Sequence, residues 1–354
     1  MFSVYFKDPL RASVEAASGG KRTVIYDDKK NPSIMYDIPK FKNSDIDSSL
    51  GTDTHPAFIV EGKEVSDIFV GCYQSIVLDG RAYSLPHVDP TTYINFDTAR
   101  GYCDAKGRGW HMTSNAERAA IALWCAKNGY FPRGNTSTGC AYDATYEHGV
   151  MGGDGRTLTG SGPQSWNHDN TAFGIADLCG NVWEWTDGLK LIDGKIYVVG
   201  QDSTPMNNFR TANTYKGTTG WIDTGACFDS SVAGSADKSG GNLGSPILNS
   251  KVTNKAYMGD STEEYYKEND CAFESLSVTS GYTPPTYLKS LAVQPLNASG
   301  TGDYLWVRNY GERIPLCGGA WTDSAGAGVF ALNLLDRRSD SGSDIGFRVA
   351  YTAI

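Results

Sequence analysis

Two tryptophans in the segment GNVWEWTDG (residues 180–188) constrain the fold of this chain more than any other feature. Trp183 and Trp185 are two residues apart, so their side chains point to the same side of a β-strand, and Glu184 points to the other side. An indole ring is stable inside a protein only where it is well packed and its N–H finds a hydrogen-bond acceptor. We therefore expect a core strand here, with a carboxylate on its opposite side.

Helices and hairpins are both predicted around this strand. Asp89 and Pro90 have the residue types of a helix N-cap and a first helical position, and a second helix begins with a capping box of Ser114 and Glu117. After the tryptophans, residues 189–199 (LKLIDGKIYVV) predict a hairpin with an Asp-Gly turn. This mixture of elements predicts an α+β domain.

The C-terminal segment 318–351 (GGAWTDSAGAGVFALNLLDRRSDSGSDIGFRVAY) mixes two kinds of position. Phe330 and Phe347 are expected in the core, and Arg348 is expected to be buried in an ion pair. In contrast, residues 335–338 put an apolar, an acidic and two basic side chains in a row, where a core strand would alternate. Such a row suits a contact surface, because the planar, multi-donor head of Arg is well adapted to recognition. An ordinary solvated loop is the alternative interpretation.

Together, the segments 174–188 and 318–351 resemble the formylglycine-generating-enzyme branch of the C-type lectin fold, and within it the variable proteins of diversity-generating retroelements. Two helices joined by GRGWHMTS and followed by GNVWEW have the layout of this family. The resemblance covers about residues 56–188 and 304–351. It implies an α+β, C-type lectin-like fold of the formylglycine-generating-enzyme type with a long insertion.

The resemblance also implies a domain organisation. Residues 1–50 are expected to form an N-terminal arm or attachment segment, and residues 51–354 the lectin-like domain. Within that domain, an insertion would occupy about residues 189–300, and a variable ligand-binding segment would occupy residues 318–346.

The positions of variable contact residues follow from the same resemblance. In these variable proteins the alternate positions derive from Asn codons whose adenines are randomised, which yields Ala, Asp, Gly, Leu, Arg, Ser or Thr but never Lys, Glu, Gln or Met. Residues 318–346 contain none of those four excluded types. Carried over by position, the ligand-binding residues are Ala320, Thr322, Asp323, Ser324, Gly326, Leu335, Asp336, Arg337, Asp340, Gly342 and Asp344.

The resemblance implies one cofactor, a structural calcium ion. Binding of a ligand would itself require no cofactor. Relatives in the formylglycine-generating family bind calcium through a side-chain oxygen, two main-chain carbonyls and a Glu. The matching positions here are Asp177, Gly180, Val182 and Glu184, all of which offer hard oxygen donors. In a second interpretation, Asp177 and Glu184 cap a loop or pair with Arg348.

Catalysis is disfavoured by the same comparison. The oxidase relatives need two cysteines a few residues apart after the GGxW motif, where the thiolates bind copper. Residues 318–346 contain no cysteine, and Cys317 stands alone before them. The five histidines show no ligand spacing. The sugar-binding motifs of calcium-dependent lectins, Glu-Pro-Asn or Gln-Pro-Asp with Trp-Asn-Asp, do not occur either. No catalytic residue is therefore assigned.

Composition limits the choice of partner. A net charge of −9 without a run of Lys or Arg argues against nucleic acid as a partner.

The eight cysteines lack metal or disulfide spacing, which favours reduced, buried thiols. The N-terminus lacks the charged start and apolar stretch of a secretory signal, and no window is apolar enough to predict a membrane span or membrane insertion.

The sequence as a whole predicts a non-catalytic protein that binds a protein or glycan receptor on a cell surface through diversified side chains. A phage or prophage tail-tip attachment protein, assembled as a homo-oligomer such as a trimer, is the favoured context. The chain would then lie in the phage virion or in the cytoplasm of the producing cell. The alternatives are a sulfatase-modifying-type enzyme that has lost or altered its cysteine site, and a bacterial surface adhesin or lectin.

Overall fold

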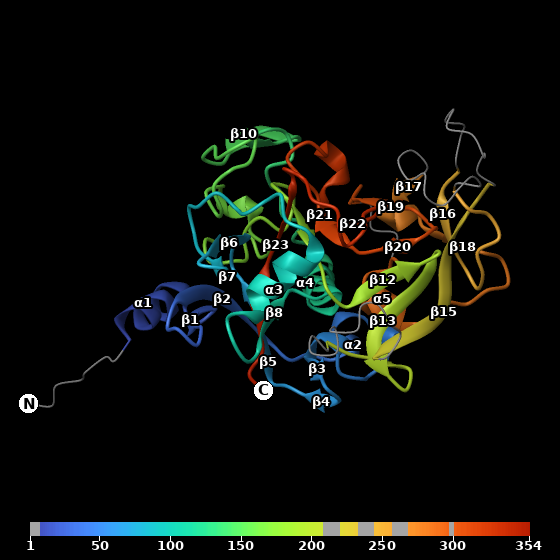
Figure 1. Cartoon of the computed structure of the whole chain (residues 1–354), viewed down its shortest axis with the longest axis horizontal. Coiled ribbons are helices and arrows are strands. Elements are labelled where there is room, and N and C mark those ends of the chain that lie inside the picture. The colour runs from blue at the N-terminus through green and yellow to red at the C-terminus, as the bar shows by residue number, and fades with distance from the viewer. Residues whose placement is uncertain (1–7, 208–219, 233–243, 257–267, 297–300) are drawn as a thin grey trace, which may run out of the picture.

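The strand with the two tryptophans pairs directly with the C-terminal segment. The computed structural model of this chain describes residues 8–207, 220–232, 244–256, 268–296 and 301–354. Strand β11 (Trp183–Trp185) pairs antiparallel with β21 (Leu316–Gly318) and parallel with β23 (Ile345–Phe347). Within the described residues this sheet has six strands, and the others are β17 (Asn269–Ala272), β19 (Tyr304–Val307) and β22 (Gly328–Leu334). The two segments that carry the resemblance are therefore hydrogen-bonded neighbours, and the red C-terminal strands run through the centre of Figure 1.

A second sheet connects the two ends of the chain. Its order is β1-β2-β5-β24-β8 among the described strands. The strands are β1 (Arg22–Tyr26), β2 (Pro32–Pro39), β5 (Asp67–Gly71), β24 (Val349–Tyr351) and β8 (Trp110–Met112). Val24 and Met35 are fully buried in it. Residues 22–39 were expected in an N-terminal arm, but they are part of the domain because their apolar side chains face its core. Helix α1 (Pro9–Ser18) lies beside β1, at the left of the coloured ribbon in Figure 1.

The expected insertion contributes a third sheet. Its order is β18-β16-β15-β13-β12-β20, with β14 beside β13. The strands are β18 (Ser277–Val278), β16 (Pro246–Asn249), β15 (Trp221–Ser230), β13 (Lys195–Gln201), β12 (Leu189–Ile192), β20 (Glu312–Arg313) and β14 (Thr204–Pro205). The predicted Asp193-Gly194 turn joins β12 and β13. Leu191 and Phe228 share one hydrophobic cluster with Leu123, so the insertion packs on the core of the domain.

The two predicted helices are present, but the first begins later than expected. Helix α3 (Phe96–Asp104) starts after Asn95, whose side chain accepts a hydrogen bond from the main-chain nitrogen of Thr98 at 2.9 Å. The assignment of Asp89 as N-cap was wrong, because this carboxylate forms an ion pair with Arg156 instead. Helix α4 (Asn115–Asn128) has the predicted capping box.

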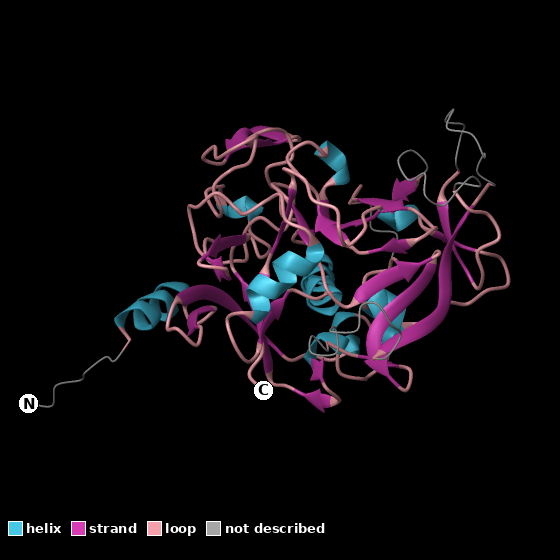
Figure 2. Cartoon of the chain, viewed as in Figure 1, coloured by secondary structure: helices cyan, strands magenta, loops and turns pink. Residues whose placement is uncertain are grey.

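The remaining elements are short, and loops connect most of them, as Figure 2 shows. They are the helices α2 (Asn43–Ile46) and α5 (Tyr287–Ser290), the strands β3 (Ile59–Val60), β4 (Lys63–Glu64), β6 (Ser75–Leu78), β7 (Arg81–Ser84), β9 (Cys140–Ala141) and β10 (Ala144–His148), and the 3-10 turns η1 (Ser48–Leu50), η2 (Pro56–Phe58), η3 (Gln164–Trp166), η5 (Phe273–Ser275) and η6 (Ser324–Gly326). Among the described residues, none of the helices has the length and apolar character needed to cross a membrane.

Candidate ligand-binding face

The core strand β11 forms the base of the candidate site. Trp185 is fully buried, its ring meets that of Phe96 edge-on at 5.9 Å, and its Nε1 donates to the carbonyl of Ile94 at 2.9 Å. Trp183 is also buried and packs edge-on against Trp306, with ring centroids 5.5 Å apart. Both indoles are thus core residues, as the two-residue spacing predicted.

On the opposite side of β11, Glu184 forms the ion pair that the sequence suggested. Arg348 Nη2 and Nε donate to the two Glu184 oxygens at 2.7 and 3.0 Å, and both side chains are buried. The same guanidinium donates to the carbonyls of Gly71 and Ala176. Burial alone would raise the pKa of Glu184, but Arg348 and Arg118 hold it below its usual value. The last turn of the segment is therefore fixed to the core by a charged, fully buried group.

Between β22 and β23, the main chain of residues 335–344 is held along its length by the surrounding frame. The donors come from four different parts of the chain, and each acceptor is a carbonyl of this stretch. The hydrogen bonds run from Ile314 N to Asp336 O (2.9 Å), Phe96 N to Arg338 O (3.2 Å), Tyr93 N to Gly342 O (2.8 Å), Arg156 Nη1 to Ser343 O (3.0 Å) and Trp183 N to Asp344 O (2.8 Å). These bonds fix the path of the backbone without using the variable side chains.

The turn after β21 is held in the same way by the loop before β9. Thr138 N donates to the carbonyl of Trp321 at 2.9 Å, and Ser324 N donates to the carbonyl of Thr136 at 3.0 Å. Within the turn, the Asp323 carboxylate accepts a bond from Ala320 N at 2.7 Å. Burial raises the pKa of this carboxyl above its usual value.

Arg156 joins the two parts of the segment. Its guanidinium lies 5.9 Å from the centre of the Trp321 ring and donates to the carbonyl of Ser343 at 3.0 Å. Asp89 holds it through two hydrogen bonds of 2.9 and 3.0 Å. The turn 321–324 and the loop 335–344 therefore both contact the buried guanidinium of Arg156, and together they form one surface.

The exposure of the predicted contact residues divides them into two groups. Ala320 is fully buried in the hydrophobic core, and Gly326 is buried where an added Cβ would lie 3.1 Å from the Trp306 ring, so their assignment as contact residues is corrected. Thr322 and Ser324 are exposed. The partly exposed residues are Asp323, Leu335, Asp336, Arg337, Asp340, Gly342 and Asp344. We call the exposed and partly exposed residues together the display face; their contact with a ligand stays a prediction.

Sequence reasoning missed aromatic side chains beside the display face. Tyr93 is 67% exposed, and its main-chain nitrogen bonds to Gly342. A hollow of about 230 Å³ separates residues 325–329 from the exposed rings of Phe131 and Tyr142. These rings lie far from the segment in sequence and belong to no motif, so only the folded structure brings them to the site.

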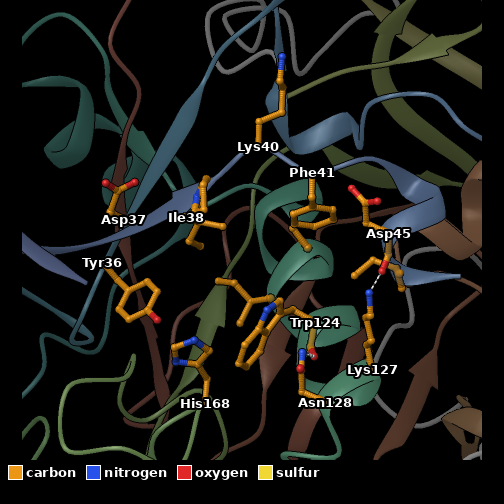
Figure 3. A pocket seen from close by; sticks show the side chains of 14 residues that line it. Tyr36, Asp37, Ile38, Lys40, Phe41, Asp45, Trp124, Lys127, Asn128 and His168 are labelled. Atoms are coloured by element: carbon orange, nitrogen blue, oxygen red, sulfur yellow. Dashed lines mark hydrogen bonds between the residues drawn. The ribbon is translucent and has the colours of Figure 1, made fainter. Parts of the chain in front are cut away.

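A larger hollow lies away from the display face, between β2 and α4. Its volume is about 440 Å³, and the rings of Tyr36, Phe41, Trp124 and His168 line it (Figure 3). Burial lowers the pKa of His168 to about 4, so its imidazole is neutral. The lining includes none of residues 318–346, all of which the structure describes.

Three of the buried cysteines, Cys317, Cys179 and Cys72, have thiols whose pKa is raised. Cys317 is buried just before the segment, and burial raises the pKa of its thiol. Burial also raises the pKa of Cys179 above the usual range and that of Cys72 to about 12. A thiol that stays protonated is a poor nucleophile and a poor metal ligand. Among the described residues, no cluster of three or more His, Cys, Asp or Glu side chains is placed to hold a metal ion.

The predicted calcium ligands do converge on one point, but a side-chain nitrogen occupies it. The carbonyls of Asp177, Gly180 and Val182 and the Oε1 of Glu184 lie 3.1–3.4 Å from Nε2 of Gln74. Asp177 takes part through its main-chain oxygen rather than the predicted side-chain oxygen, because its carboxylate accepts a bond from Gly160 N at 2.7 Å. With Gln74 in place, these residues do not fit a calcium ion.

Comparisons with known proteins give one family and several similar structures. The model of the sulfatase-modifying factor enzyme 1-like domain matches residues 16–232. The structure is similar to that of PvdO from Pseudomonas aeruginosa, with 14% sequence identity and a TM-score of 0.36; the match covers 94% of this chain and 98% of PvdO. It is also similar to Treponema denticola variable protein 1, with 14% identity and a TM-score of 0.33; that match covers 93% of this chain and 98% of the Treponema protein. A third similar structure is the Major Tropism Determinant U1 variant, with 13% identity and a TM-score of 0.31; this match covers 90% of this chain and 62% of that protein. No curated protein matches the chain.

Proposed function

This chain belongs to the sulfatase-modifying factor enzyme 1-like family, and on that scaffold we propose that it is a non-catalytic binding protein whose display face contacts the ligand. The family match confirms the predicted α+β fold of the formylglycine-generating-enzyme type. The family includes enzymes, so the absence of catalysis is part of the proposal. It is supported by the buried, protonated thiols and by the lack of cysteine in residues 318–346.

One observation carries this proposal. The frame bonds to five carbonyls between residues 336 and 344, while the side chains of Leu335 and Arg337 remain partly open to solvent. Side chains such as those of Leu335 and Arg337 can therefore be exchanged without altering the path of the main chain. The carboxylates of Asp323 and Asp340 also accept hydrogen bonds from main-chain nitrogens of the segment, so exchange at these two positions is expected to have a larger effect on its shape. A surface whose backbone is already ordered loses little entropy on binding, so new side chains translate directly into new specificity.

The chemistry of the display face suits a polar macromolecular partner. It combines hydroxyls, carboxylates and the guanidinium of Arg337, and exposed rings such as Tyr93 and Tyr142 flank it. Such a mixture can bind the polar groups and the flat faces of a protein or a glycan. We propose a receptor of this kind on a cell surface, with the chain acting as a phage or prophage tail-tip attachment protein. Assembly as a homo-oligomer such as a trimer would strengthen weak single contacts.

Exchange of the display face is expected to change binding and to leave folding unchanged. In the triple variant Thr322→Arg, Ser324→Arg, Leu335→Arg, all three side chains reach solvent, so the free energy of unfolding should change by less than about 2 kcal/mol. The profile of binding to a panel of bacterial cells and to a glycan array should differ from that of the parent.

The matched control carries Lys195→Ser and Asp223→Ser, an exposed pair on the sheet of the insertion. This control is expected to keep both the stability and the binding profile of the parent. Equal binding profiles for the parent and the triple variant, against a panel that the parent binds, would place the ligand site elsewhere.

A further inference from the structure

Four oxygen atoms around the turn 177–184 point at a single nitrogen atom. The side chain of Gln74 is fully buried, and its Nε2 lies 3.2 Å from Asp177 O, 3.4 Å from Gly180 O, 3.1 Å from Val182 O and 3.2 Å from Glu184 Oε1. An NH₂ group has two hydrogens and can satisfy two of these acceptors well. A cage with more oxygen acceptors than the donor can satisfy has the character of a cation site.

The hydrogen bonds around Gln74 determine which end of its amide faces the cage. Gln74 Oε1 accepts a bond from Nδ2 of Asn181 at 2.7 Å. The orientation of Asn181 is fixed in turn, because its Oδ1 accepts a bond from the main-chain nitrogen of Thr157 at 2.8 Å. Turning the Gln74 amide over would set two oxygens or two NH₂ groups against each other. The nitrogen therefore belongs in the cage.

The charge of the cage is already balanced by side chains. Glu184 is its one carboxylate, and it lies 2.7 Å from Arg348 and 3.7 Å from Arg118. The carboxylate of Asp177 is directed away from the cage, to Gly160 N. Calcium sites use carboxylate charge to offset the cost of stripping water from a divalent ion. Here that negative charge already faces two guanidinium groups.

We propose that the amide of Gln74 takes the place of a bound calcium ion in this chain, and that the two guanidinium groups on Glu184 close the oxygen cage to a divalent cation. The loop that leads into β11 then keeps its shape without any divalent cation. Since β11 is the base of the display face, this face stays assembled at any calcium concentration. The inference concerns the frame alone and stands whether or not the display face binds a ligand.

The parent protein provides the first test. Its melting temperature is expected to agree within about 1 °C between buffer with excess EDTA and buffer with millimolar CaCl₂. Protein purified without chelator should contain far less than one calcium per chain by elemental analysis. A melting temperature that drops by several degrees in EDTA, or stoichiometric bound calcium, would overturn the proposal.

The variant Gln74→Ala provides the second test, because it empties the cage. In EDTA it should melt at least about 5 °C below the parent, and millimolar CaCl₂ should restore little of that loss, because Arg348 and Arg118 still neutralise the one carboxylate of the cage. Gln164→Ala, at an exposed position, should behave like the parent in both buffers. A variant as stable as the parent in EDTA, or a loss that calcium largely reverses, contradicts the proposal that the amide fills a cage closed to divalent cations. If this variant does not fold, the measurements on the parent still decide.

Discussion

Replacement of Arg348 by Met is expected to lower the free energy of unfolding by about 3–5 kcal/mol. Met keeps much of the volume of the side chain but leaves Glu184 as a buried carboxylate without its closest partner. It also removes the donors to the carbonyls of Gly71 and Ala176. An unpaired buried charge is among the most destabilising changes that a single substitution can make.

Chemical denaturation followed by circular dichroism measures this loss. The matched control is Arg133→Met, because Arg133 and Asp143 form an arginine–carboxylate pair in which both side chains are more than one third exposed. That variant should lose less than about 1 kcal/mol. Adding Glu184→Gln to Arg348→Met should recover part of the loss, since the carboxylate left without Arg348 is then removed. Recovery stays incomplete, because the buried Arg118 loses the carboxylate that it faces at 3.7 Å. A loss as small as that of the control would show that the pair does not hold the segment to the core.

Trp185→Ala is expected to cost a similar amount, about 3–5 kcal/mol. The fully buried indole packs edge-on against Phe96 and satisfies the carbonyl of Ile94. Its removal leaves a cavity between β11 and α3 and a carbonyl without its donor. Both effects act on the strand that pairs with β21 and β23.

Tyr146→Ala is the control for Trp185→Ala, because Tyr146 is an aromatic residue with 79% of its surface exposed. Its loss should change the free energy of unfolding by at most about 0.5 kcal/mol. The same denaturation experiment compares the two variants with the parent. If Trp185→Ala were no more destabilising than Tyr146→Ala, β11 could not be the central strand of the frame.

Features that depend on neighbouring residues were predictable from the sequence. The spacing of Trp183 and Trp185 indicates a buried strand, because alternation along a strand is a local property. The capping box of Ser114 and Glu117 satisfies main-chain groups only three residues apart, so its residue types identify the start of α4.

Features that depend on residues far apart in the chain could not be predicted from the sequence. Asp89 has the residue type of an N-cap, but Arg156, far along the chain, takes its carboxylate. Ala320 occupies a variable position of the family by its place in the sequence, yet it packs in the core of this chain. Gln74 gives no local sign that its amide reaches the oxygen cage of the turn before β11. In each case a tertiary contact decides between interpretations that the local sequence leaves equal.

The central claim is that the side chains of the display face are exchanged while the frame is kept. Sequencing of this gene across a population of its source tests that claim directly, by comparing codons 318–346 with the rest. We expect substitutions to concentrate at the codons of the display face, with Trp321, Gly346 and Arg348 unchanged and residues 320 and 326 remaining small. Substitutions spread evenly along the gene, or gathered at frame positions, would contradict it and leave a scaffold of fixed specificity.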